Sequence, residues 1–212
     1  MVHDFRKKNY GQSGTECQII DIFWILSKKG ANVMDLRKKK TMRAIKAAFY
    51  ALRENKNVEQ ISVTELTRKA EISKATFYLH YHDIFDLSEK LKQEVILSVM
   101  SRLEDPMELL TDSIAFMDKL VAALEAEKEN VLPLFSGSQA AALPTSIEAS
   151  LKEYIFAHAS HLRSDARINV YLTYHIQGGY YAYMENVERL GYDQVIDVIA
   201  EIQNTLNVMK AK

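Results

Sequence analysis

The segment SKATFYLHYHD, residues 73–83, gathers groups that could do chemistry: a lysine, a serine, a threonine, two histidines and three aromatic rings. Such side chains could line a catalytic site, ligate a metal or contact a nucleic acid. His80 and His82 lie two residues apart and face different ways on a helix, which disfavours a shared metal. The chain has no Gly-rich phosphate loop, nucleophile motif or paired catalytic carboxylates. The residue types therefore favour a nucleic-acid contact, and no enzyme is predicted.

The polar side chains near the start of this segment each have a partner on DNA. Lys74 can donate to guanine acceptors or to a phosphate, while Ser73 and Thr76 can bond phosphate oxygens. The methyl group of Thr76 can also touch a thymine methyl. Tyr78 can place its hydroxyl on a phosphate and its ring against a sugar. Two structural alternatives stay open: Ser73 as a helix cap only, and Tyr81 as a core residue only.

The residues upstream predict the element that positions these side chains. Ser62, with Glu65 three residues later, is a capping-box pattern that marks a helix start. Ser73 is a second cap, so two short helices are joined by a tight turn. That spacing is typical of a helix-turn-helix, whose second helix enters the major groove. The apolar residues of both helices are expected to face inward: Val63, Leu66, Ala70 and Phe77.

A longer helix is predicted before these two, over residues 36–55. Its apolar residues recur at three and four positions, which is the pattern of one buried face: Ile45, Ala48, Phe49 and Leu52. Its first turns carry clustered cations: Lys38, Lys39, Lys40 and Arg43. Positive charge is unfavourable at a helix N-terminus, so these cations are expected to serve a partner.

The charge of the whole chain points to the same partner. The net charge is −1, but residues 34–92 carry +5 and residues 93–212 carry −8. A basic portion on an acidic body suggests a partner with phosphates. The alternative is a basic face that contacts only solvent.

Composition predicts an all-α protein. Hydrophobic residues make up 48% of the chain, enough for a core, and they recur at helical rather than strand spacing. No apolar run is long enough to span a membrane. The single cysteine, Cys17, excludes an intrachain disulfide and permits a reducing compartment, so a cytoplasmic location is expected.

The stretch ISVTELTRKAEISKATFYLHYHDIFDL, residues 61–87, resembles the N-terminal domain of the TetR/AcrR family of bacterial transcriptional regulators. The residues that carry the resemblance are Ala70, Ile72, Ser73, Thr76, Phe77, Tyr78, His80, Tyr81 and Leu87. It covers about 60 residues strongly and the remainder only by helical layout. At Ile84 the chain departs from the family, many members of which have a lysine there, and one phosphate contact is expected to be lost.

The resemblance implies a three-helix DNA-binding domain over residues 34–82 and a larger helical domain for ligand binding and dimerisation over residues 83–212. It implies a homodimer that binds a palindromic operator in double-stranded DNA and responds to an unknown small-molecule effector, without a cofactor. The predicted DNA-binding residues are Lys39, Arg43, Ser62, Thr64, Ser73, Lys74, Ala75, Thr76, Tyr78, His80 and Tyr81. A ligand-responsive repressor is thus the expected function. The alternatives are a coregulator of the same fold that acts through a protein partner, and a small helical enzyme.

The remaining sequence predicts further helices. A long one begins near Asp83 and ends near residue 104, with Leu87, Leu91, Val95 and Val99 as its buried stripe. Others are expected over residues 107–128, 145–162 and 164–190, and from residue 192 onward. The stretch NVLPLFSG is expected to form a short helical turn closed by Gly137, and SQAAALPTS, residues 138–146, to form a loop.

An apolar pocket between these helices is the expected ligand site. The residues predicted to line it are Phe116, Met117, Tyr154, His158, Tyr171, Tyr174 and His175. His158 and His161 could share a helix face, but no third ligand completes a metal set, so no metal is predicted.

The last two helices are predicted to form the dimer interface. The helix over residues 164–190 is apolar on most sides, and the final helix has a seam of apolar residues at coiled-coil spacing. Two adjacent glycines within a helix suggest a close approach of another backbone, with a kink or an intrachain contact as the alternative. The predicted interface residues are Gly178, Gly179, Val195, Ile199, Ile202 and Leu206.

Residues 1–33 read differently from the rest of the chain. The stretch QIIDIFWIL, residues 18–26, is short, interrupted by Asp21 and a poor signal peptide. The residues KKGA before Met34 can be encoded by a purine-rich string like a bacterial ribosome-binding sequence. One hypothesis is therefore that translation begins at Met34, and the other is that residues 1–33 form a genuine extension.

Overall fold

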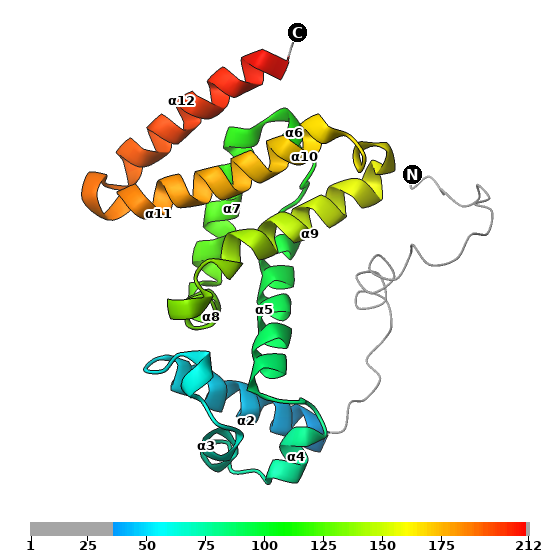
Figure 1. The fold of residues 1–212 in the computed structure, drawn as a ribbon, viewed down its shortest axis with the longest axis vertical. Coiled ribbons are helices and arrows are strands. Elements are labelled where there is room, and N and C mark those ends of the chain that lie inside the picture. The colour runs from blue at the N-terminus through cyan, green and yellow to red at the C-terminus, as the bar shows by residue number, and fades with distance from the viewer. Residues whose placement is uncertain (1–35, 211–212) are drawn as a thin grey trace, which may run out of the picture. The chain divides into compact units, whose positions relative to one another are not determined.

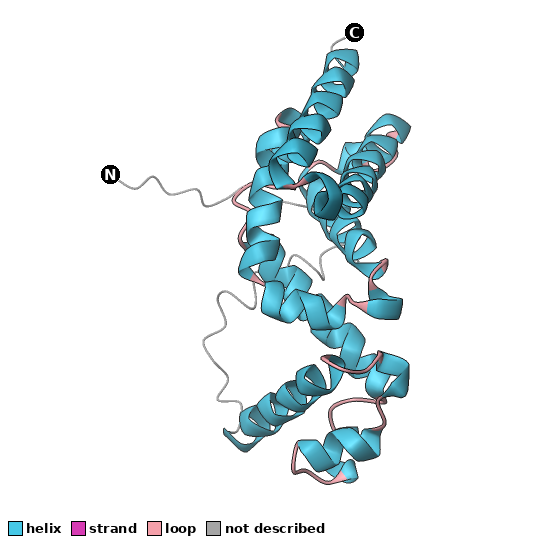
Figure 2. Cartoon of the chain, turned by 90° about the vertical axis from the view of Figure 1, so that its left-hand side faces the viewer, coloured by secondary structure: helices cyan, strands magenta, loops and turns pink. Residues whose placement is uncertain are grey.

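The computed structural model describes the backbone of residues 36–210 and the side chains of residues 37–202. Every regular element in this part of the chain is a helix and none is a strand, which confirms the all-helical prediction (Figures 1 and 2). The hypothesis about Met34 and the N-terminal extension concerns residues outside the described range.

The first four elements are α2 (Leu36–Arg53), the short 3-10 turn η1 (Val58–Gln60), α3 (Val63–Lys69) and α4 (Lys74–Tyr78). Both predicted caps are present. The Ser62 hydroxyl accepts from the Glu65 amide at 3.2 Å, and the Ser73 hydroxyl accepts from the Thr76 amide at 3.0 Å. The Glu65 carboxylate does not reach back to Ser62 but pairs with Lys56. Each helix therefore starts where its hydroxyl cap satisfies a free backbone donor.

The turn between α3 and α4 bends through Glu71, whose φ is +55°. Its neighbours close the turn, because the Ile72 amide donates to the Thr67 carbonyl at 3.0 Å. The inward faces of the three helices share one core, in which Ile45, Phe49, Leu66 and Phe77 are fully buried. Two short helices joined by a tight turn are thus present, and α4 is held to the core by Phe77.

Helix α5 (Ile84–Ser101) begins at Asp83, whose carboxylate accepts from the Asp86 amide at 2.8 Å. The predicted stripe lies inward, since all four of its members are buried: Leu87, Leu91, Val95 and Val99. This helix contacts η1 on one side and α7, α8 and α9 on the other. Because it is buried along most of its length, α5 connects the first three helices to the rest of the chain.

The elements that follow are α6 (Glu108–Thr111), α7 (Ser113–Ala126), α8 (Lys128–Leu134), η2 (Gly137–Gln139), α9 (Ala142–His158), η3 (Ser160–Leu162), α10 (Ala166–Thr173), η4 (Tyr174–Gly178), α11 (Gly179–Leu190) and α12 (Tyr192–Lys210). Helices α11 and α12 pack against each other, and α12 also contacts α7.

The structure departs from the predicted elements in two boundaries and in the geometry of one helix. The helix predicted over residues 107–128 is broken at Asp112, whose carboxylate caps α7 by accepting from the Ala115 amide at 3.1 Å. The loop predicted over residues 138–146 is shorter, because α9 already begins at Ala142. The helix predicted over residues 164–190 contains a π-helical segment, η4, between α10 and α11. Such a segment has an extra residue per turn, which apolar periodicity alone does not indicate.

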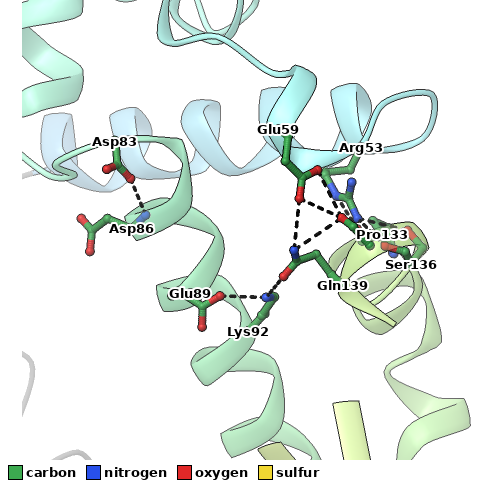
Figure 3. A network of polar contacts seen from close by, with 10 residues as sticks. Arg53, Glu59, Asp83, Asp86, Glu89, Lys92, Pro133, Ser136 and Gln139 are labelled. Carbon is green, nitrogen blue, oxygen red and sulfur yellow. Dashed lines mark hydrogen bonds and ion pairs between the residues drawn. The ribbon is translucent and has the colours of Figure 1, made fainter. Parts of the chain in front are cut away.

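A buried arginine joins α2 to the turn after α8. The Arg53 side chain donates to the Pro133 carbonyl at 2.7 Å, to the Lys56 carbonyl at 2.8 Å and to the carbonyl and hydroxyl of Ser136 at 3.1 and 3.2 Å. Figure 3 shows the contacts of Arg53 with Pro133 and Ser136 beside a second set. Because Arg53 is only 5% exposed, these acceptors take the place of the water that its guanidinium loses on folding.

The second set of contacts runs through Gln139 (Figure 3). Lys92 of α5 donates to the Gln139 side chain at 2.5 Å and to Glu89 at 2.7 Å. Glu59 of η1 accepts from the Ser138 hydroxyl at 2.9 Å and from Gln139 at 3.4 Å. The turn also fits closely against Asn57, since a Cβ on Gly137 would lie 2.2 Å from the Asn57 side-chain oxygen. Residues 136–139 are therefore held by hydrogen bonds and close packing against both α5 and the loop after α2.

Glu127, between α7 and α8, ties these helices to α5. Its carboxylate accepts from Arg102 at 2.8 Å, from the Ser98 hydroxyl at 2.7 Å and from Asn130 at 2.9 Å. The hydrogen bond from Arg102, followed by those from Ser98 and Asn130, lowers the pKa of Glu127 to about 2. The folded state therefore favours the ionised carboxylate more strongly than the unfolded state does.

This depressed pKa predicts acid sensitivity. The stabilisation from Glu127 is complete above its ordinary pKa of 4.5 and is lost as the pH falls toward 2. We expect Glu127→Gln to unfold at a lower temperature than wild type near neutral pH, with the difference shrinking between about pH 5 and about pH 3. Calorimetry at several pH values measures this. Glu125→Gln, which removes an exposed pair with Lys128, is the control. Its unfolding temperature should differ from that of wild type by the same amount at both ends of this pH range. A constant difference between wild type and Glu127→Gln would contradict the assignment.

Candidate nucleic-acid interface and internal cavity

Helix α4 presents the polar side chains that the sequence singled out. Lys74, Ala75 and Tyr78 are exposed, and Thr76 is half-buried with its hydroxyl 2.8 Å from that of Ser73. Tyr78 is 56% exposed although it is aromatic, and its ring meets Phe77 edge-on at 5.5 Å. The inward residue of α4 is Phe77, so the opposite side of the helix is free to contact another molecule.

Helix α2 adds cations to the same end of the chain. The Tyr81 hydroxyl donates to Met42 Sδ at 3.7 Å, which holds the residues after α4 against the first half of α2. Lys38, Lys40 and Arg43 are exposed there, and no ion pair with another described residue involves them. By contrast, Lys46 further along α2 pairs with Glu94 of α5. These three cations therefore lie in the first half of α2, where Tyr81 also contacts this helix.

The other predicted DNA-binding residues divide into exposed and buried positions. Ser62 and Thr64 are exposed at the start of α3, while Lys39 and His80 are half-buried. Tyr81 is different, because its ring is buried against Phe77 at a centroid separation of 5.6 Å, and burial raises its pKa to about 12. Tyr81 is therefore a core residue, in agreement with the alternative role predicted for it. We remove it from the candidate interface.

Exposed residues at the ends of α3 and α4 were also missing from the predicted set. Arg68 and Lys69, at the end of α3, form no ion pair with another described residue. Their charge could have singled them out, since positive patches are the usual mark of a phosphate-binding face. Leu79 is 81% exposed at the end of α4. No sequence signal indicates that, because a leucine beside Phe77 and Tyr81 reads as core.

The described chain contains a cavity of about 230 Å³ among its C-terminal helices. Its walls come from α7, α8, α9, η4, α11 and α12 and are mostly apolar, with Met117, Phe135, Tyr180, Tyr183 and Met184 among them. Three charged residues border it: Asp118, Glu125 and Lys128. Glu125 and Lys128 pair with each other at 3.3 Å. A site of this kind suits a small, largely apolar molecule.

Of the residues predicted to line the ligand site, only Met117 lines this cavity. Phe116 and His175 are buried in the core instead. Tyr154 stacks on the exposed His158, Tyr171 packs on His175, and Tyr174 is 55% exposed. The prediction chose mainly polar aromatic residues of α9, α10 and η4, whereas the walls are mainly aliphatic and come in large part from α8, α11 and α12.

The residues predicted for the dimer interface are also divided. Val195 is buried within the chain and Ile199 lines the cavity, so this half of the seam has partners in α11 and α7. Gly179 faces the Met117 side chain, 3.6 Å from a Cβ built there, which is the intrachain alternative. Gly178 and Ile202 are exposed. Leu206 lies outside the described side chains.

No group of three or more His, Cys, Asp or Glu side chains among the described residues could hold a metal ion. None of the helices described is both long and apolar enough to cross a membrane.

Comparisons of the chain with protein-family models, with curated proteins and with solved structures found no match.

The cavity makes a prediction about apolar probes. We expect the dye N-phenyl-1-naphthylamine to bind wild type and to brighten as it leaves water. Ala200→Phe, which places a ring in the cavity wall, should weaken that binding at least about tenfold. Ala149→Phe, on an exposed position of α9, is the matched control and should bind the dye as wild type does. Equal dye affinity in all three proteins would place the dye elsewhere.

Proposed function

We propose that the protein is a DNA-binding transcriptional regulator that resembles the TetR/AcrR family and binds a palindromic operator as a homodimer. One observation carries this proposal: Lys74 and Tyr78 project from the second helix of a helix-turn-helix, beside cations of α2 without acidic partners. In such an arrangement the second helix lies in the major groove, and flanking cations contact phosphates. The basic charge of residues 34–92 supports the same partner.

A ligand-dependent response is part of the proposal. The cavity and the candidate DNA face are connected, since Val131, Leu132 and Phe135 form one cavity wall, and Pro133 between them accepts from Arg53 of α2. A ligand changes DNA affinity only if it binds two arrangements of the chain unequally. A small apolar effector that shifts this wall acts on the Arg53 contact, and through it on α2. On this reading the protein is a repressor that releases DNA when the effector binds.

A second copy of the chain is the proposed partner of α10–α12. Large apolar side chains are exposed along these helices: Val170, Tyr174, Tyr181, Met184, Val198 and Ile202. Exposed apolar residues gathered on neighbouring helices are typical of an interface, and two-fold pairing would cover them with their own copies. The corrected interface thus uses the outer face of α10–α12, because Val195 and Ile199 already pack within the chain.

A coregulator that acts through a protein partner is the second candidate. The strongly exposed Leu79 favours it, because a protruding leucine can enter a pocket on another protein. The unpaired cations around α4 count against it, since a face that no longer bound DNA would have no need of them.

DNA binding should depend on α4. We expect Lys74→Ala and Tyr78→Ala each to weaken binding to a selected operator by about 1–3 kcal/mol. Lys40→Ala should weaken binding to all sequences alike and reduce the salt dependence slightly. Titration of labelled duplexes at several salt concentrations measures both effects. Lys119→Ala, on α7, is the control and should change neither. If the Lys74 and Tyr78 variants match wild type on operator and random DNA, α4 does not read the sequence.

The dimer should depend on the outer face of α11. We expect Met184→Asp to convert a dimer at micromolar concentration into a monomer, because the interface would have to bury an unpaired charge. Sedimentation equilibrium reports the mass. Leu97→Asp, at a similarly exposed leucine of α5, is the control and should stay dimeric. A monomeric wild type, or a Met184→Asp protein that remains dimeric and folded, would place the interface elsewhere.

A further inference from the structure

Leu79 is the most exposed large hydrophobic residue among the described residues, at 81%. It ends α4, where its amide donates to the Ala75 carbonyl at 3.2 Å. Any residue but proline supplies that backbone bond, so the fold does not require a leucine here. The side chain is also absent from the hydrophobic cluster that Phe77 and Tyr81 join. Its apolar character therefore has no role inside the chain.

The position of Leu79 distinguishes it from a scattered surface leucine. It is four residues after Ala75, a spacing at which two residues share one face of a helix, and it directly follows Tyr78 at the C-cap of α4. All three side chains are exposed. The face that presents Lys74 to a partner thus has an apolar edge made of Ala75 and Leu79. A molecule that Lys74 and Tyr78 contact would also meet this edge.

Only one apolar group lies on a base edge in the major groove of unmodified DNA. It is the C5-methyl group of thymine, while the other groups at the base edges are hydrogen-bond donors and acceptors. A leucine cannot satisfy those donors and acceptors, and burying them without a partner is unfavourable. Contact with a thymine methyl instead removes apolar surface of both groups from water. The cations on α2 and Lys74 identify DNA, rather than an apolar protein pocket, as the molecule that covers Leu79.

We propose that Leu79, flanked by Ala75, reads the C5-methyl group of a thymine in each half-site of the operator. This inference rests on the proposed function and adds a residue that determines which base is preferred. It assigns to Leu79 a sequence-selective role, in contrast to the phosphate-binding role of the α2 cations.

The test uses deoxyuridine, which pairs like thymine but lacks the methyl group. An operator is first selected from random DNA with the wild-type protein. Each thymine is then replaced in turn by deoxyuridine, symmetrically in both half-sites, and the dissociation constants are measured by anisotropy. We expect a loss of about fourfold per half-site at one symmetric position with wild type, which is the contribution of one buried methyl group. Leu79→Ala should bind the thymine and deoxyuridine operators equally at that position.

Two further variants separate the methyl contact from general damage. Leu79→Met keeps an apolar tip and should restore part of the preference for thymine. Leu97→Ala, at an exposed leucine of α5, should keep the full wild-type preference. Binding to random DNA, which does not depend on base edges, should be unchanged in Leu79→Ala.

The outcomes distinguish this inference from the function on which it rests. If wild type selects no DNA sequence, the proposed function fails and the inference fails with it. If wild type binds an operator but no deoxyuridine replacement matters, or the same loss persists in Leu79→Ala, the inference alone is overturned. Retained operator preference in Leu79→Ala together with loss of binding to a purified protein partner would assign Leu79 to protein recognition instead.

Discussion

The buried guanidinium of Arg53 is the constraint on which the arrangement of the chain depends. It stands at the end of α2, and its acceptors lie in the loop after α2, in the last turn of α8 and in the turn that follows α8. A buried cation without its acceptors would be strongly unfavourable, so α2 and that turn must move together or not at all. Gly137 adds a second restriction, because its lack of a side chain leaves room for Asn57.

This constraint gives the cavity a mechanical connection to the candidate DNA face. Helix α8 is short and contains Pro133, so the carbonyl that Arg53 uses belongs to the same turn of helix that lines the cavity. Helix α5 runs alongside and is itself tied in through Lys92 and Glu127. Hydrogen bonds therefore join α8 to the end of α2, which is the route by which the proposed ligand response would reach α2.

The helices and the α4 face could be predicted from the sequence because their signals are local. Ser62 and Ser73 cap helices within three residues, and the stripe of α5 repeats at helical spacing. The cavity could not be predicted, because a helix with more than one apolar face gives no sign of which face lies inward. Tyr171 and His175 suggest a ligand site by type, yet they stack on each other, while aliphatic residues such as Ile199 form the walls. The π-helical segment before Gly179 likewise has no periodic signature.

The turn before α4 has a further consequence, which concerns local opening. Glu71 holds a left-handed backbone conformation that costs a non-glycine residue about 1 kcal/mol or more. When the turn and α4 open together, that strain is released, and only five residues of helix are lost. Opening of this segment should therefore require less free energy than unfolding of the core beneath it, so amide hydrogens of α4 exchange with solvent sooner than those of α5. A partner that binds the closed form of α4 slows this exchange, and its binding becomes visible there without any change in the rest of the chain.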